Sequence, residues 1–159
     1  MNIFIKKKLL ILIPIFVFFD QFTKEWALQK IFLDENIIQI TPFLNFVPVW
    51  NKGISFGMFS GIENINFFVT IATLIILLIL ILWFLKSISL LHRLALIFII
   101  SGAIGNLIDR FKHQAVVDFI DFHVNNIHWP AFNFADTCIT IGAFIYLFSI
   151  FTSEKFNNV

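Results

Sequence analysis

The stretch from Phe67 to Leu85 contains no charged residue and only two threonines among its apolar side chains. A helix of about 20 largely apolar residues is what crosses a hydrocarbon core about 30 Å thick. In lipid the backbone must satisfy its own hydrogen bonds, which leaves the helix as the natural form for one such span. The rest of the chain agrees, because 59% of it is hydrophobic and 13% is charged, against about 45–50% and about 25% in soluble domains. We predict a single membrane-embedded domain over residues 1–159.

Three further segments are apolar enough to be transmembrane helices, at about 8–29, 91–110 and 134–151, beside the one at about 67–85. The first follows Lys6, Lys7 and Lys8 and therefore resembles a secretory signal peptide. No small-x-small cleavage site follows it, and the apolar run continues directly into Asp20. We predict an uncleaved first helix, and thus an all-α polytopic membrane protein with four transmembrane helices.

The positions of lysine and arginine give the orientation. The N-terminal lysines, the short loop with Lys86 and Arg93, and the tail with Lys155 fall on one side. We therefore predict that the N- and C-termini are cytoplasmic and that the loops at about 31–66 and 111–133 face outward. β-favouring stretches broken by proline and glycine predict a small extracytoplasmic β-sheet in the first loop. The second loop is short and amphipathic, which favours an interfacial helix or loop.

Several polar residues lie within the predicted helices, where each ionisable group costs about 2.5–3.5 kcal/mol on insertion scales. Asp20 and Lys24 are four residues apart and share a helix face, so they form either an interfacial ion pair or a brace for a functional site. Asn106 and Arg110 also share a face, one turn apart. The small residues from Ser101 to Gly105 permit close helix packing.

Two aspartates are predicted to reach the outer membrane boundary from adjacent segments. Asp118 lies among apolar residues, and Asp136 lies at the start of the fourth helix. Each has a simple structural explanation, since Asp136 suits the first turn of a helix and Asn133 suits its N-cap. These structural roles do not explain why the two aspartates converge at one depth of the membrane with Asn51, Asn106 and Arg110.

Two carboxylates in one partly desolvated site share a proton, so one can act as a base and the other as an acid. Other chemistries find less support. The four histidines have no metal-ligand spacing with acids on one helix face, no Gly-x-Ser-x-Gly element occurs, and Cys138 suits a small buried position better than a reactive thiol. A transporter subunit would show repeats or helices broken near the midplane, and a structural subunit would not need the two carboxylates.

The chain resembles the bacterial lipoprotein signal peptidases (signal peptidase II), an aspartyl protease family, over nearly its whole length. Five motifs carry the resemblance in order: Asp20-Gln21-Phe22-Thr23-Lys24, Asn51 to Phe56, Gly102 to Arg110, Val117 to Asp121 and Phe132 to Asp136. The resemblance implies a β-sheet cradle between the first two helices and the catalytic pair Asp118 and Asp136, with Asp121 auxiliary. Residues implied to support the site or bind substrate are Asp20, Lys24, Asn51, Gly53, Asn106, Arg110, Asn133 and Ala135.

The resemblance also implies an activity and a location. The expected reaction removes signal peptides from diacylglyceryl-modified prolipoproteins by cleavage just before the lipidated cysteine. It is expected in the bacterial inner membrane, with the active site at the extracytoplasmic boundary. We expect contacts with prolipoprotein substrates and membrane lipids, a monomer, and no cofactor, metal or nucleic acid.

Overall fold

The computed structural model describes residues 9–53, 64–87 and 89–157, with side chains as far as Phe151. The N-terminal lysines, the side chain of Lys155, and the part of the first outward loop that includes Ile54 to Phe56 lie outside these limits.

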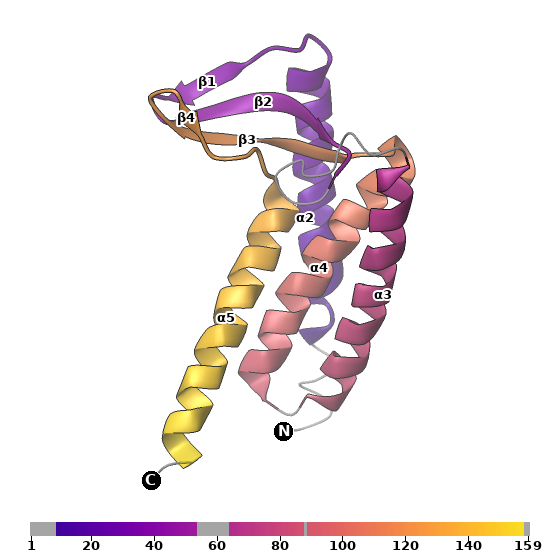
Figure 1. The fold of residues 1–159 in the computed structure, drawn as a ribbon, viewed down its shortest axis with the longest axis vertical. Helices are drawn as coiled ribbons and strands as arrows, with labels where there is room; N and C mark the ends of the chain where they lie inside the picture. The colour runs from indigo at the N-terminus through magenta and orange to yellow at the C-terminus, as the bar shows by residue number, and fades with distance from the viewer. Residues whose placement is uncertain (1–8, 54–63, 88, 158–159) are drawn as a thin grey trace.

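In the described part of the chain, four long helices run side by side (Figure 1). The first, α2 (Leu12–Ala27), continues into a short π-helical turn, η1 (Leu28–Phe32); the others are α3 (Ile65–Lys86), α4 (Leu90–His113) and α5 (Phe134–Asn157). Three helical segments in the described part of the chain are long and apolar enough to cross a membrane: Ile65–Lys86, Leu90–His113 and Phe134–Phe151. The 16 residues of α2 do not reach that length, so a fourth span stays a prediction.

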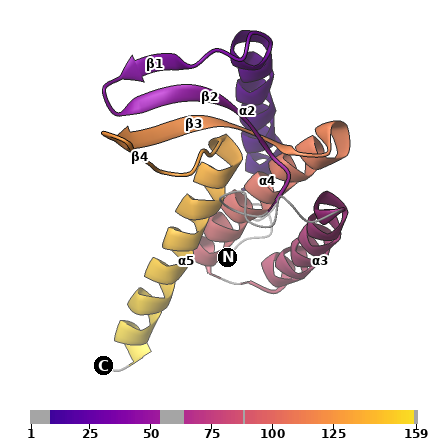
Figure 2. The ribbon, with the colours of Figure 1, turned by 45° about the horizontal axis from the view of Figure 1, so that its top comes forward.

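Helix α4 is the centre of the bundle and contacts α2, α3 and α5 (Figure 2). Leu96, Ile97 and Ile100 of α4 form its apolar core with Leu77 and Phe84 of α3. On another side α4 approaches α5 closely, because a Cβ atom on Gly102 would lie only 2.7 Å from the Ile139 side chain. The small residues of α4 therefore permit close helix packing, as expected from the sequence.

A four-stranded antiparallel sheet covers the end of the bundle where α2 ends and α5 begins (Figure 1). Its strands, in spatial and chain order, are β1 (Ile38–Thr41), β2 (Leu44–Asn51), β3 (Val116–Val124) and β4 (Ile127–His128). The β2–β3 register shifts between Phe46 and Val49. Pro48 lies in this interval and has no N–H to donate to the ladder, which accounts for the irregularity.

The segment predicted as the second outward loop is therefore a β-hairpin, and the interfacial helix considered for it is wrong. Val117 and Phe119 pack under the sheet against Ala27 and Ile31, whereas the side chain of Asp118 faces a pocket. This alternation is the period of a strand. Pairing with β2, which lies more than sixty residues earlier in the chain, decides the outcome, and the local amphipathic pattern did not contain that information.

Candidate active site

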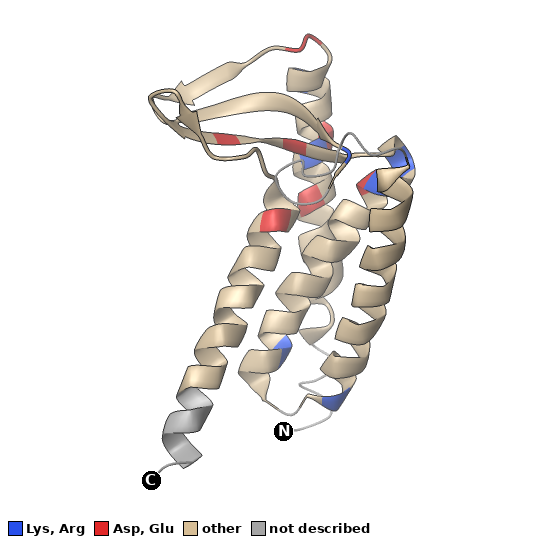
Figure 3. Ribbon diagram, viewed as in Figure 1, with Lys and Arg blue, Asp and Glu red and all other residues tan. Residues whose placement is uncertain are grey.

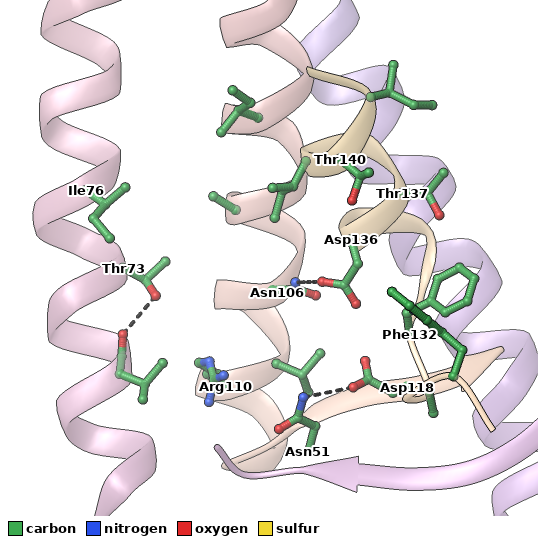
Figure 4. A pocket seen from close by; sticks show the side chains of 18 of the residues that line it. Asn51, Thr73, Ile76, Asn106, Arg110, Asp118, Phe132, Asp136, Thr137 and Thr140 are labelled. Carbon is green, nitrogen blue, oxygen red and sulfur yellow. Dashed lines mark hydrogen bonds between the residues drawn. The ribbon is translucent and has the colours of Figure 1, made fainter. Parts of the chain in front are cut away.

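A pocket of about 730 Å³ lies between the sheet and helices α3, α4 and α5. Apolar side chains and threonines of α3 and α5 line the part away from the sheet, including Ile76 and Ile139. Towards the sheet the lining becomes polar, and Figure 4 shows Asp118 of β3 and Asp136 of α5 facing the same space. The pocket thus has an apolar part between α3 and α5 and a polar part that contains two carboxyl groups.

Asp118 is 1% exposed and is held by amides on both of its oxygens. Asn51 Nδ2 donates to Oδ2 over 2.9 Å, and Asn133 Nδ2 donates to Oδ1 over 2.7 Å. The sheet places Asn51 well for this contact, because Val49 is the direct partner of Asp118 and Asn51 lies two residues further along the same face. Asn51 Oδ1 accepts from Gly53 N–H at 3.0 Å, which fixes the direction of the amide.

Asp136 belongs to a reciprocal cap at the start of α5. The N-cap residue Asn133 accepts from Asp136 N–H through its Oδ1 at 3.0 Å, and Asp136 Oδ2 accepts from Asn133 N–H at 3.2 Å. This is the geometry of a capping box. The other carboxyl oxygen, Oδ1, accepts from Asn106 Nδ2 at 2.8 Å. The capping role expected from the sequence is therefore present, and the same residues also line the pocket.

Asn133 connects the two carboxyl groups. Its side chain caps the helix of Asp136 and donates to Asp118, and its Nδ2 also lies 3.2 Å from Asn106 Oδ1. Asn133 is fully buried, and its amide oxygen accepts a hydrogen bond while its amide nitrogen donates. The amides of Asn51, Asn106 and Asn133 thus hold the two carboxyl groups, both of which line the pocket.

Burial, together with the nearby charge of Asp136, raises the pKa of Asp118 to about 7. Hydrogen bonds from Asn51 and Asn133 and the charge of Lys24 oppose this rise. Desolvation is the largest of these effects, as expected for a carboxyl that has left water. A group with this pKa exchanges a proton readily near neutral pH, which suits acid–base catalysis.

Behind the carboxyl pair lies a buried ionic network centred on Lys24. Its Nζ is 2.9 Å from Asp20 Oδ2, 2.9 Å from Asp109 Oδ2 and 2.9 Å from Asn106 Oδ1. Lys24, Asp20 and Asp109 are almost completely buried, so the brace expected as one alternative describes Asp20 and Lys24 better than a surface ion pair. Asp20 Oδ1 also accepts from Ala135 N–H at 2.9 Å, which ties α2 to the first turn of α5.

Arg110 closes the pocket beside α3. Nη1 donates to Asn66 Oδ1 at 3.0 Å and Nη2 donates to the Gly53 carbonyl at 2.6 Å. Arg110 therefore fastens the ends of β2 and α3 to α4, and its guanidinium lines the pocket (Figure 4). Gly53 thus contributes through its backbone.

Sequence reasoning overlooked Asp109 and Gln21 as members of the site. Asp109, 2% exposed, accepts from Lys24, from Gln21 Nε2 at 2.9 Å and from Val117 N–H at 3.1 Å. The signal available in the sequence was an acidic residue directly before Arg110 in a largely apolar helix. Among the residues that the structure describes, no cluster of three or more His, Cys, Asp or Glu has the arrangement to hold a metal ion. Cys138 is buried in α5, as expected.

Comparison with known proteins gives the family. The model of the family described as signal peptidase (SPase) II matches residues 12–152. This chain belongs to the signal peptidase II family. It is therefore a protease of lipoprotein processing and a multi-pass membrane protein. The matched segment extends from α2 to α5 and so includes every described residue of the pocket.

Relatives of similar length support the assignment. A lipoprotein signal peptidase of Anaplasma marginale is 40% identical, with 89% of this chain and 84% of the relative covered. The protein of that name from Pelagibacter ubique is 39% identical, with 94% and 91% covered. Two solved structures described as bacterial membrane enzymes are similar, with TM-scores of 0.78 and 0.75 and identities of 31% and 30%. The first covers 96% of this chain and 90% of its own length, and the second 93% of each.

Proposed function

We propose that this protease is an aspartic endopeptidase in which Asp118 and Asp136 activate water. The observation that carries the proposal is the pair of carboxyl groups at the polar end of one pocket, each of which accepts two hydrogen bonds. Two such groups in a desolvated site share one proton, which supplies the acid and the base that peptide hydrolysis needs.

The ionised member of the pair takes a proton from a water molecule, whose oxygen attacks the carbonyl carbon of the scissile bond. The protonated member gives its proton to the carbonyl oxygen, so that a neutral gem-diol forms. Return of a hydroxyl proton to a carboxylate restores the carbonyl as the C–N bond breaks. The other carboxyl protonates the leaving nitrogen, which leaves a new carboxyl end and a new amine.

The substrate that fits is a prolipoprotein carrying a diacylglyceryl group, cut just before the lipidated cysteine. Its signal peptide would lie as a helix along the apolar part of the pocket, between α3 and α5. Thr73 and Ile76 line that part on the α3 side (Figure 4). The acyl chains would remain in contact with lipid, and the scissile bond would reach the carboxyl pair at the membrane boundary.

We further propose that α2 is the fourth transmembrane helix of an inner-membrane protein with both termini in the cytoplasm. Supporting this, α2 runs beside α4, and the carboxylates of the site gather at the sheet end of the bundle (Figure 3). Lys86 is the last residue of α3, and α3 ends at the opposite end of the bundle (Figure 1), as the positive-inside rule requires of a lysine on the cytoplasmic side. The sheet and the active site would then be extracytoplasmic.

The test uses the purified full-length chain in detergent–lipid micelles with a lipidated prolipoprotein. Asp118→Asn and Asp136→Asn keep the shape of each side chain and remove its ability to carry the shared proton. Each is expected to lower the cleavage rate by at least about a hundredfold, within the range of acid–base catalysis. Asp34→Asn, at an exposed position before the sheet, is the matched control and should cleave normally. Retained cleavage by either pocket variant would refute the mechanism.

A further inference from the structure

One hairpin connects the two proposed catalytic aspartates. The chain leaves Asp118 along β3, turns after Val124, and returns through β4 to Asn133 and the start of α5. No other element intervenes between the two carboxyl groups in this part of the chain. The register of the hairpin therefore sets where the N-terminus of α5, and with it Asp136, lies relative to Asp118.

The backbone ladder of this hairpin is short. β4 has two residues, paired as His123 with His128 and Val124 with Ile127. Trp129 N–H still donates to the Phe122 carbonyl at 2.7 Å, and pairing resumes only at Phe132, which bridges to Ile120. Pro130 lies in the interval and has no N–H to donate. The return strand therefore has few backbone hydrogen bonds to β3 between His128 and Phe132.

A side-chain contact strengthens the hairpin where the ladder is weak. His128 Nδ1 lies 2.9 Å from Oδ1 and 2.9 Å from Oδ2 of Asp121, whose side chain is 7% exposed. Asn45 Nδ2 of β2 donates to Asp121 Oδ2 at 3.1 Å. Asp121 thus connects β2, β3 and the return strand. The titratable groups facing His128 are Asp121 and His123, whose ring stacks on it with centroids 5.0 Å apart; β2 presents a neutral amide.

We propose that Asp121 and His128 form a clasp that positions the catalytic pair. The clasp fixes the register of the return strand against β3 and so holds Asp136 at its working position relative to Asp118. It also holds Trp129 and Phe132, which line the pocket. Neither clasp residue lines the pocket itself, so both are positioning residues. The proposal rests on the proposed function, because it takes Asp118 and Asp136 as the reacting groups.

Two substitutions of His128 separate the hydrogen bond from the ring. His128→Phe keeps a planar ring that can stack on His123 and loses the donor to Asp121. His128→Asn loses the ring but places an amide N–H near the position of Nδ1. We expect His128→Phe to lower kcat about tenfold or more with KM changed less than about threefold, because small misplacements of reacting groups act on rate. His128→Asn should recover kcat to within about threefold of the parent.

The control variant is His113→Phe. His113 is exposed at the end of α4 and lies against Trp50, so this substitution should leave kcat and KM unchanged. The reverse ranking, with the asparagine variant slow and the phenylalanine variant normal, would mean that ring packing matters and would overturn the clasp. Parent-like kinetics in both variants would overturn it too. Failure of the proposed function looks different, because Asp118→Asn would then continue to cleave whatever the His128 variants do.

Discussion

Asp118 should reduce the stability of the protein at neutral pH, and Asp118→Asn should remove that cost. The pKa of Asp118 is raised from an ordinary value near 4 to about 7. Between these values the folded protein holds a proton that the unfolded chain has lost. The free energy of unfolding therefore falls as the pH rises through this window.

The magnitude follows from linkage. For one carboxyl with a pKa of 3.8 unfolded and about 7 folded, the free energy of unfolding falls by roughly 2.6 kcal/mol between pH 5 and pH 8. An asparagine at this position does not titrate and contributes no such slope. The asparagine amide places an NH₂ against Asn51 or Asn133, which costs about 1–3 kcal/mol through a lost hydrogen bond at every pH. That cost shifts the whole curve and leaves its slope unchanged.

The assay is unfolding of the parent and Asp118→Asn in mixed micelles at several pH values, followed by tryptophan fluorescence. The quantity of interest is the difference between the two proteins at pH 8 minus the difference at pH 5, since titrating groups that do not interact with residue 118 cancel in it. We expect Asp118→Asn to gain about 2–3 kcal/mol relative to the parent over this range. The repulsion between Asp118 and Asp136 is already counted in this value, because it contributes to the raised pKa of Asp118. Parallel pH dependence of the two proteins would refute the reasoning.

Two further predictions concern the buried network. Lys24→Met leaves Asp20 and Asp109 buried without their shared cation and should lower the free energy of unfolding by about 3–5 kcal/mol; Lys52→Met, at an exposed lysine, should have no effect in the same unfolding assay. Gly105→Ala should destabilise, although the change usually stabilises a helix by about 0.5–1 kcal/mol, because the new Cβ would meet the side chain of Asp20; a raised midpoint of unfolding would contradict the tight packing.

The sequence predicted those features that depend on local pattern. The charge-free run from Phe67 to Leu85 lies within α3, because apolar composition and length are sufficient to specify such a helix. Gathering of the polar residues at one end of the bundle was predicted as well, since alternating helix directions bring the end of one helix beside the start of the next. The capping role of Asn133 followed from its position alone.

Features that depend on distant partners were not predictable in this way. Whether residues 116–124 form a strand was decided by pairing with β2. The place of Asp109 in the site depends on how α4 is rotated against α2, since Gln21 and Lys24 reach it from more than eighty residues away in the chain. A single sequence records residue types and spacing, whereas rotation and register are set by packing of the whole bundle.

The arrangement of charges suggests why the network behind the carboxyl pair exists. Lys24 is buried with two carboxyl groups of its own, Asp20 and Asp109, so its positive charge is compensated within this group of three. Lys24 is connected to the carboxyl pair through Asn106, whose Oδ1 accepts from Lys24 while Nδ2 donates to Asp136. The cation therefore fixes which end of the amide faces Asp136. A lysine placed directly beside the pair would stabilise both ionised carboxylates and remove the shared proton. Held one side chain away, Lys24 orients the donor and leaves Asp118 able to exchange a proton near neutral pH.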